Sequence, residues 1–254
     1  MNNKLKQFKS LVSSILFLLT TLGLVFTTVY GVRYICSDKE DVNIPIHKVD
    51  TKDNKLALSF DVALGSSDID EILSILDKYN IKATFFLVGS WVDNNENLVK
   101  KIYENGHEIG NHSNTHANTK ELSKENVVKE IQLTEEKIEK ITGDKPTLYR
   151  PPFGEIDKKT LEICKSLGYK VINWDVDSMD WKEIGPNHVI ERVLKSSEPG
   201  SIILFHSNIN NPSDYLETII SKLKKDGYEM VKVSDLVYKD NYIIDGDGTQ
   251  KIKK

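Results

Sequence analysis

The chain has 254 residues, of which 39% are hydrophobic and 28% charged, enough for one well-filled globular domain. Its 34 basic and 38 acidic residues give a formal net charge of −4 at pH 7, and the lysines are scattered among acids. This pattern is typical of a solvated surface and excludes the basic face that a nucleic-acid partner requires.

The N-terminus has the pattern of a membrane segment. Lys4, Lys6 and Lys9 precede an uncharged stretch, residues 10–32. As a helix rising about 1.5 Å per residue it would be about 34 Å long, enough to cross a hydrocarbon core of about 30 Å. The lysines favour a cytoplasmic N-terminus and place the rest of the chain outside. We therefore predict a single-pass membrane protein in which residues 1–36 are the cytoplasmic N-terminus and transmembrane signal-anchor.

The alternative for this stretch is a cleaved secretory signal, which would leave the domain secreted. The stretch is long for the apolar core of a signal peptide, and residues 28–30 lack the small residues of a cleavage site, so the anchor is preferred. Both interpretations, the anchor and the cleaved signal, place the domain outside the cytoplasm. With only two cysteines, Cys36 and Cys164, such a domain must be held together by its core, and Cys164 is expected to be buried there.

Strand-like and helix-like segments alternate along most of the chain. Residues 37–54 are polar and are interpreted as a stalk. Residues 55–237 then alternate short apolar runs, such as 171–176, with amphipathic stretches of helical periodicity, such as 69–76. About seven such repeats predict an α/β domain whose parallel sheet is either closed into a barrel or doubly wound. Residues 238–254 are polar and are expected to form a frayed tail.

Two acids at the start of the first helical stretch are assigned a structural role. Asp68 and Glu71 have the spacing of a helix N-cap and its capping partner. We therefore expect them to stabilise the start of this helix and to take no part in chemistry.

Unusual polar residues follow the predicted strands. In parallel α/β folds, ligands bind at the carboxyl ends of the strands. The residues at these ends are Asp61, His112, Arg150, Asp177, Asp180 and His206. Because these strand ends share one rim, the sequence predicts an active site there.

The segment from His112 to His116 holds two imidazoles four residues apart, a spacing that lets both reach one cation. The alternative is a pair of ordinary surface histidines. Gly110 and Asn111, directly before the pair, predict a tight turn that would fix the direction of both rings.

Asp61 directly follows an apolar strand and is interpreted as a general base that deprotonates a metal-bound water. The alternative is a carboxylate that caps a turn. Arg150 is a candidate ion-pair partner for it. Two prolines, Pro151 and Pro152, follow Arg150 and remove backbone donors, so the N–H of Phe153 could face a substrate oxyanion.

His206 ends a strand that is otherwise free of polar side chains. Asp180 offers it a carboxylate partner that would raise its pKa, as a general acid requires. The alternative is a hydrogen-bonded core histidine. Trp181, next to Asp180, could form a wall for a sugar ring.

These residues, in this order, resemble the polysaccharide deacetylases of carbohydrate esterase family 4, the NodB-homology domain. The resemblance covers about residues 56–236. Its motifs are met at Ser59-Phe60-Asp61-Val62, His112 to His116, Arg150 to Gly154, Asp177 to Trp181, and Leu204 to His206.

The resemblance implies a distorted barrel and a set of roles. Asp61 would be the base and Arg150 its orienting partner, while His112 and His116 would ligate zinc or a similar metal. His206 would be the acid, tuned by Asp180. Phe153, Trp181 and Leu204 would contact the substrate.

One position departs from the family pattern. Val62 stands where the family usually has a second aspartate, the third metal ligand, so weaker metal binding is expected. The surrounding residues are similar to those of sporulation-associated deacetylases, which points to peptidoglycan of the cell wall or spore cortex.

The leading hypothesis is thus metal-dependent N-deacetylation of extracellular peptidoglycan by a monomer. One alternative is a degenerate glycan-binding homologue that turns over slowly or not at all. Another is a chitin or xylan deacetylase with the same chemistry.

Overall fold

The computed structural model describes residues 44–253 except 67, 183 and 210. The expected membrane segment, residues 10–32, and the first part of the expected stalk lie outside these residues. Among the helices that are described, none is long and apolar enough to cross a bilayer.

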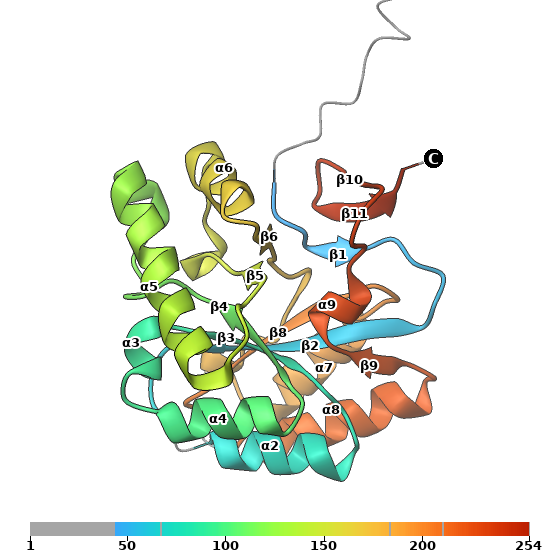
Figure 1. The fold of residues 1–254 in the computed structure, drawn as a ribbon. Helices are drawn as coiled ribbons and strands as arrows, with labels where there is room; N and C mark the ends of the chain where they lie inside the picture. Colours follow the sequence, from blue (N-terminus) through green and yellow to red (C-terminus); the bar gives the residue numbers. More distant parts are fainter. Residues whose placement is uncertain (1–43, 67, 183, 210, 254) are drawn as a thin grey trace, which may run out of the picture. The chain divides into compact units, whose positions relative to one another are not determined.

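A parallel sheet forms the centre of the domain (Figure 1). Its strand order is β6-β5-β4-β3-β2-β8-β7, and β9 pairs with the start of β2. The strands are β2 (Lys55–Val62), β3 (Thr84–Leu87), β4 (Glu108–Asn111), β5 (Leu148–Tyr149), β6 (Lys170–Val171), β7 (Val176–Asp177), β8 (Ile202–His206) and β9 (Glu229–Val231).

The sheet is curved into a barrel-like arc. The curvature is shown by the short connection between its two edge strands, β6 and β7. Strands β6 and β7 lie at opposite ends of the order, which in a flat sheet would put them about 29 Å apart. Yet Val171 and Val176 are five residues apart, a distance of at most about 18 Å. The run 171–176 was expected to be one strand, and this is wrong, because the chain leaves one edge at Ile172 and joins the other at Val176. The expected distorted barrel is confirmed.

The longer helices cover the outside of the arc, whereas Val233 and Leu236 of the short helix α9 pack with Ala57 on its inner face. The helices are α2 (Ile69–Lys78), α3 (Gly89–Val92), α4 (Glu96–Glu104), α5 (Lys124–Thr142), α6 (Lys158–Ser166), α7 (Pro186–Ser196), α8 (Ser213–Lys225) and α9 (Val233–Leu236), with 3-10 turns η1 (Thr119–Glu121), η2 (Pro152–Gly154) and η3 (Asp180–Lys182). Local signals set the ends of α5: the Ser123 hydroxyl accepts from Asn126 N–H, and Gly143 takes the left-handed conformation (φ 80°).

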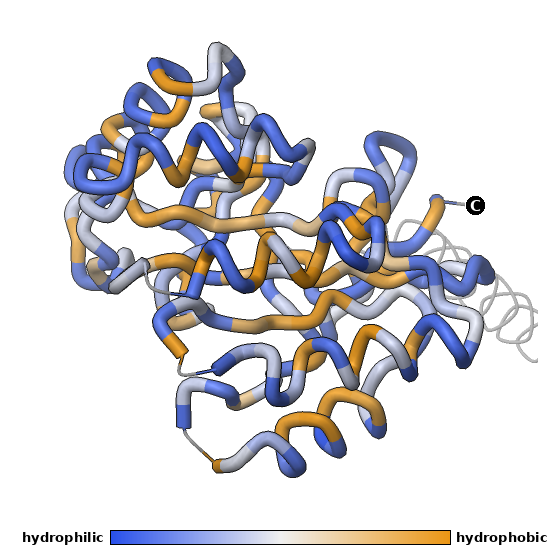
Figure 2. The backbone as a smooth tube through the Cα atoms, turned by 90° about the horizontal axis from the view of Figure 1, so that it is seen from below, coloured by the Kyte–Doolittle hydropathy of each residue, from blue (hydrophilic) through white to orange (hydrophobic). Residues whose placement is uncertain are grey.

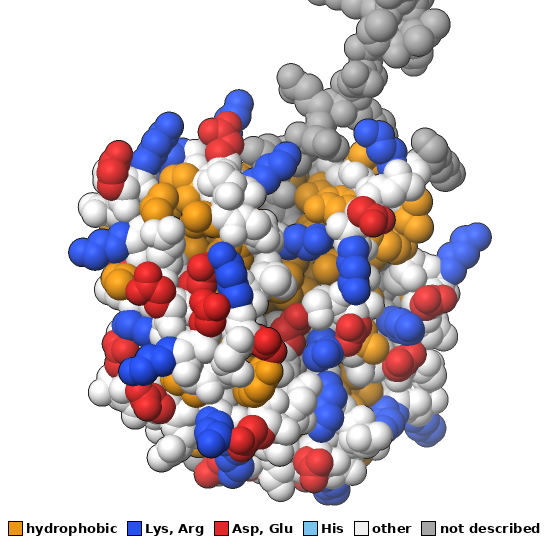
Figure 3. All heavy atoms as spheres, viewed as in Figure 1, with side chains coloured by type: hydrophobic (Ala, Val, Ile, Leu, Met, Phe, Trp, Pro, Cys, Tyr) orange, Lys and Arg blue, Asp and Glu red, His pale blue; other side chains and the backbone are white. Residues whose placement is uncertain are grey.

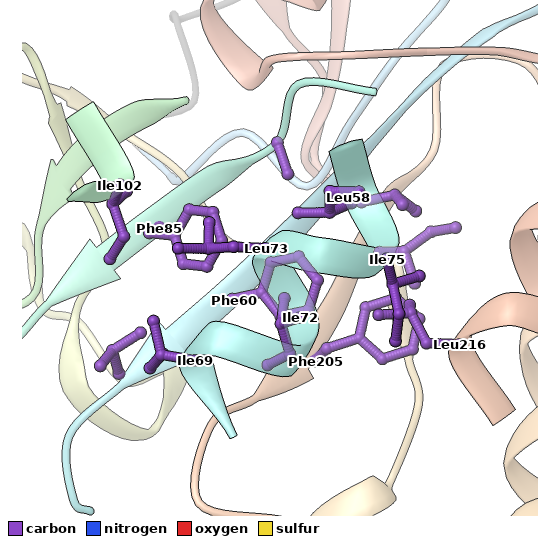
Figure 4. Packing of buried hydrophobic residues seen from close by; sticks show 14 of the residues in the cluster. Leu58, Phe60, Ile69, Ile72, Leu73, Ile75, Phe85, Ile102, Phe205 and Leu216 are labelled. Atoms are coloured by element: carbon purple, nitrogen blue, oxygen red, sulfur yellow. The ribbon is translucent and has the colours of Figure 1, made fainter. Parts of the chain in front are cut away.

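Apolar strands and one face of each helix form the core. The rings of Phe60, Phe85 and Phe205, from the neighbouring strands β2, β3 and β8, stack with centroid distances of 4.9 and 5.6 Å (Figure 4). Figure 2 shows apolar strands between helices whose hydropathy alternates along the chain. On the face in Figure 3, acidic and basic side chains are interspersed. The core therefore fixes the strands whose ends carry the expected site.

A second, three-stranded sheet joins the two ends of the described chain. In it β1 (Lys48–Val49) pairs in parallel with β11 (Thr249–Ile252), which pairs antiparallel with β10 (Tyr242–Ile244). The expectation that residues 44–54 belong to a stalk and 238–254 to a frayed tail is therefore corrected. Isolated bridges from Ile46 to Ile172 and from Lys48 to Ser201 also tie this sheet to the open seam of the arc.

Candidate active site

The strand ends bring five of the predicted residues together. Asp61 lies at the end of β2, His112 directly follows β4, Arg150 directly follows β5, and His206 ends β8. Asp180 lies in η3, after β7. The contacts described below connect them in two groups, one around Asp61 and one around His206.

Asp61 and Arg150 form a buried ion pair. Arg150 is 0% exposed and Asp61 7%, and Nη1 of Arg150 lies 2.8 Å from Oδ1 of Asp61. The guanidinium also donates to the Ser59 hydroxyl (2.9 Å) and the Asn173 carbonyl (3.1 Å), and lies 4.0 Å from the centre of the Phe86 ring. Burial alone would raise the pKa of Asp61, but Arg150, followed by His112 and His206, lowers it overall. Asp61 is therefore held ionised.

His112 is fixed in both orientation and tautomer. It is buried, and its Nδ1 lies 2.7 Å from the Arg150 carbonyl oxygen, to which it donates. Its Nε2, 3.5 Å from Oδ2 of Asp61, is then left with a free lone pair. Burial lowers the pKa of His112, so the ring is neutral at pH 7, the state that a metal ligand requires.

His116 lies against His112, with ring centroids 4.9 Å apart. It is half-buried, and its ring nitrogens make no hydrogen bond to any residue in the described part of the chain. Burial, and then the neighbouring His112, lower the pKa of His116 to about 4. The loop that carries both rings is held by Glu130 of α5, which accepts from Asn114 N–H (2.9 Å) and Thr115 N–H (2.8 Å).

These residues fit a divalent cation that has two imidazole ligands. His112 and His116 present neutral rings beside the ionised Asp61. Val62, in the place of the expected third ligand, is 0% exposed and offers no donor atom. Across the described residues, no group of three or more His, Cys, Asp or Glu side chains could hold a metal ion. The donor set is thus one ligand short of a typical catalytic zinc site.

His206 and Asp180 form the second group. Nδ1 of His206 lies 2.8 Å from Oδ1 of Asp180, and the backbone N–H of His206 donates to Oδ2 (2.9 Å). Burial would lower the pKa of His206, but the hydrogen bond and charge of Asp180 raise it overall. Asp180 therefore stabilises the protonated form of the half-buried His206, whose Nε2 lies on the side away from Asp180.

Tyr215 of α8 completes this group and was missed by the sequence analysis. Its buried hydroxyl donates to Oδ2 of Asp180 (3.2 Å), and its ring stacks on Phe205. In the sequence it lies at an apolar position of an amphipathic helix, where a tyrosine looks like an ordinary core residue. The one feature of the sequence that could have revealed its role is the hydroxyl group, which needs a hydrogen-bond partner when it is buried.

The expected substrate contacts differ in exposure. Phe153 is 61% exposed, its ring lies 4.7 Å from that of His116, and its N–H has no acceptor among the described residues. Trp181 is 52% exposed, 6.4 Å from the His206 ring. Leu204 lies two residues before His206 on the same face of β8, but is only 2% exposed, so little of it can touch a substrate.

Backbone strain collects in the loops of this site. Ser113, His116, Phe153 and Met179 have φ between 58° and 70°, and they are the described residues other than asparagine and glycine with positive φ. Such conformations are costly for these residue types and persist where the surroundings hold them, often at functional sites.

Comparison with known proteins identifies the family. The family model described as "Polysaccharide deacetylase" matches residues 48–172. Peptidoglycan-N-acetylmuramic acid deacetylase PdaA of Bacillus subtilis is 31% identical over 192 residues, which cover 74% of this chain and 73% of PdaA. The chain belongs to the polysaccharide deacetylase family. The resemblance drawn from the motifs is thereby confirmed.

A second relative of this polysaccharide deacetylase has a longer chain. Peptidoglycan-N-acetylglucosamine deacetylase PgdA of Listeria monocytogenes is 35% identical over 204 residues, which cover 80% of this chain but only 42% of PgdA. The chain thus spans about two fifths of the length of PgdA. The named relatives are hydrolases that act on N-acetyl groups of peptidoglycan.

The solved structures include a relative without activity. BA3943 of Bacillus anthracis, described as a pseudoenzyme of the CE4 family, is 35% identical, with a TM-score of 0.74 over 76% of this chain and 69% of its own. A mutant of BA3943 is described as having restored enzymatic activity. The family therefore holds both enzymes and pseudoenzymes on this fold.

Proposed function

We propose that this chain hydrolyses N-acetyl groups of peptidoglycan amino sugars with the help of a divalent metal, zinc being the first candidate. The observation that carries the proposal is the placement of Asp61 and His206 side by side on neighbouring strands, each bonded to a different partner. Arg150, 2.8 Å from Asp61, lowers the pKa of that carboxyl, and Asp180, 2.8 Å from His206, raises the pKa of that imidazole. Amide hydrolysis needs both a proton acceptor and a proton donor in this arrangement.

Each residue then has a defined task. A cation held by His112 and His116 would acidify a bound water and polarise the acetamide carbonyl. Asp61 accepts a proton from the attacking water, and Arg150 keeps Asp61 ionised and oriented. The free N–H of Phe153 donates to the oxygen that becomes negative. His206 gives its proton to the departing nitrogen, so that the products are acetate and an amino sugar.

The relatives support peptidoglycan as the substrate, because PgdA and PdaA are named for its two amino sugars. The exposed rings of Phe153, which lies beside His116, and of Trp181, which lies beside His206, suit the apolar faces of sugar rings. Deacetylation of chitin or xylan would keep the same chemistry and change only the sugar.

A second function, glycan binding without turnover, is favoured by two observations. Val62 leaves the metal site one ligand short, and the similar BA3943 is a pseudoenzyme. The two functions differ in acetate release from purified peptidoglycan, measured with and without added zinc. Zinc-dependent release that is lost in Asp61→Asn supports the enzyme. Binding of peptidoglycan with no release under either condition supports the glycan-binding function.

We also propose that residues 1–36 anchor a monomeric domain at the outer face of the membrane, where it meets the cell wall. The support is the uncharged stretch 10–32 after three lysines. The full-length protein should remain in the membrane pellet after a high-salt wash. Release of a mature form that begins near residue 30 would show a cleaved signal instead.

A further inference from the structure

A carboxylate of α5, Glu130, binds the loop between the two neighbouring histidines. Its Oε2 accepts hydrogen bonds from the Ser113 hydroxyl (2.6 Å), the Asn114 N–H (2.9 Å) and the Thr115 N–H (2.8 Å). Its Oε1 accepts from the Thr115 hydroxyl (3.0 Å). One half-buried side chain thus satisfies four donors, and these come from all three residues that separate the two imidazoles.

The carbonyl groups of the same loop bind a second helix, α3. Gly89 N–H donates to the Ser113 carbonyl (2.9 Å), and Ser90 N–H donates to the Asn114 carbonyl (2.8 Å). For the N–H groups of residues 114 and 115, Glu130 is the only acceptor in the part of the chain that the structure describes. The pairing of the loop backbone is therefore complete only while this carboxylate is in place.

The face of α5 that carries Glu130 fits closely against the loop. Thr134 and Lys137, about one and two turns further along, lie on the same face of the helix. A Cβ atom at Gly89 would collide with the Thr134 hydroxyl and the Asn114 amide, and Lys137 donates to that amide (2.8 Å). The loop therefore has no room to move toward α5 and follow a shorter acid at position 130.

His116 depends on this loop more than His112 does. His112 donates from Nδ1 to the Arg150 carbonyl (2.7 Å), whereas the His116 ring makes no hydrogen bond to any residue that the structure describes. A histidine that ligates a metal is usually oriented by a hydrogen bond from its other ring nitrogen. For His116 the orientation has to come from its backbone, which directly follows Thr115 and has a costly positive φ of 59°.

Carboxylates also hold the loop that follows His206. Ile209 N–H donates to Oδ2 of Asp68 (3.1 Å), and Ser213 N–H donates to Oε1 of Glu71 (3.2 Å). The expected role of Asp68 is corrected here: it occupies the N-cap position of α2, but its side chain makes no capping hydrogen bond. The ring of His206 has a carboxylate partner of its own, so its orientation depends less on the loop.

We infer that Glu130 is the positioning residue of the metal site: by holding the backbone of residues 113–115 it fixes the direction of the His116 ring, and so sets the affinity for a divalent cation. The inference rests on the proposed function, because it takes His112 and His116 as metal ligands. With Val62 in the place of a third ligand, more of that affinity depends on how well the two imidazoles are held.

Two substitutions at Glu130 separate the effect of position from the effect of charge. Glu130→Asp keeps the charge, but its carboxylate is one methylene further from the loop. Glu130→Gln loses the charge, but its carbonyl oxygen can replace Oε2 and its amide can donate to the Thr115 hydroxyl. The same two substitutions at Glu136, an exposed residue of α5, are the matched controls.

The zinc affinity of the full-length protein is measured by competition with a chelator. We expect Glu130→Asp to weaken zinc binding by about 10–100-fold, the usual cost of losing a partner that orients a metal ligand, and Glu130→Gln by less than about threefold. Both Glu136 variants should match the wild type. An equal loss in the two Glu130 variants, a larger loss in Glu130→Gln, or no loss in either overturns the inference.

The measurements are repeated with Val62→Asp added to each protein, so that the test does not require the natural site to hold zinc tightly. The same order of affinities is expected there. Absence of zinc binding in both series also overturns the inference.

Acetate release from purified peptidoglycan, measured in parallel, separates this inference from the proposed function. If the zinc affinities follow the expected order but no protein releases acetate, Glu130 keeps its role and the catalytic proposal fails. If acetate release depends on zinc but the zinc affinity is the same in all variants, the catalytic proposal stands and the role of Glu130 fails.

Discussion

Asp61 and His206 are register partners on the adjacent parallel strands β2 and β8. Partners in a parallel pair project to the same face, and neighbouring strands are about 4.8 Å apart. The strand pairing thus places a carboxylate of lowered pKa beside an imidazole of raised pKa. In the proposed mechanism Asp61 accepts a proton and His206 donates one, because Asp61 is bonded to Arg150 and His206 is bonded to Asp180.

Removing either group should therefore cost most of the turnover. Asp61→Asn and His206→Gln should each lower kcat for acetate release by about 10²–10⁴-fold, the usual contribution of a general base or acid. Asp61→Asn should also lower the free energy of unfolding by about 3 kcal/mol, because Arg150 keeps a buried charge without its partner. Thermal unfolding measures the second effect. Wild-type kcat in His206→Gln would identify His206 as a core histidine.

The pH dependence of kcat/KM should depend on the residues that set the pKa of His206. Since the proton donor must be charged, kcat/KM should fall on the alkaline side as His206 loses its proton. Asp180→Asn removes the interaction that raises the pKa of His206, so this limb should move to lower pH.

Tyr215→Phe should shift the alkaline limb of the kcat/KM profile in the opposite direction. Loss of the hydroxyl that donates to Asp180 makes the carboxylate more basic, so the limb should move to higher pH. Chemical shifts of the His206 ring protons provide the same test without turnover. A limb that stays in place in both variants would show that His206 is not the group being titrated.

Acid stability should depend on His107, which lies outside the active site. This buried imidazole accepts the Ala83 N–H at Nδ1 (3.2 Å), and burial lowers its pKa from 6.5 to about 4. Between these values the unfolded chain binds a proton that the folded chain does not, so stability falls as the pH drops. The loss should approach about 3 kcal/mol near pH 4.

His107→Asn keeps an acceptor for Ala83 but has no group that titrates in this range. Its melting temperature should therefore fall less than that of the wild type between pH 7 and pH 4. His188→Asn, at an exposed histidine of α7, is the control and should follow the wild type. Equal pH dependence in all three proteins would contradict the role of His107.

Restoring a carboxylate at Val62 should strengthen the metal site. Val62→Asp should tighten zinc binding by at least about tenfold, measured by competition with a chelator, since a ligating charge is worth several kcal/mol in a dry site. Val62→Asn is the matched control, because asparagine has the shape of aspartate but carries no charge. Stoichiometric zinc in the wild type, held as tightly as in Val62→Asp, would show that another ligand replaces the missing one.

The small sheet sets how far the chain can be shortened. A version that begins at residue 44 keeps Ile46 and Val49, whereas one that begins at residue 55 loses both. Each is buried, and burying such side chains contributes about 1.5–3 kcal/mol. The shorter version should therefore unfold at a clearly lower temperature than the longer one. Equal melting temperatures would mean that β1 adds nothing to the stability of the domain.

The sequence predicted the polar residues at the strand ends better than the residues that hold them in place. Asp61 and His206 stand out because each ends an apolar run, and strand ends gather at one edge. Tyr215, Asp68 and Glu71 act through partners more than thirty residues away, and their local patterns are those of ordinary helix positions. Only the tertiary structure distinguishes such residues from core or capping residues.

The ends of the domain were misjudged for a related reason. Strand β1 has two residues, too short for an alternating pattern, and it is ordered by pairing with β11 and by bridges to the seam of the arc. The predicted strand at 171–176 failed because an apolar run does not show where a chain passes from one sheet edge to the other.

The pairing of Lys48 with Thr249 also has a consequence for folding kinetics. It joins residues about 200 positions apart, so forming it closes a loop that includes nearly the whole domain, at a high entropic cost. We expect this contact to form late, after the central strands have assembled. A circular permutant that links Ile252 to Ile46 and opens the chain after Gly143 would make the contact local. Its small sheet should then form early, and the seam between β6 and β7 would close sooner.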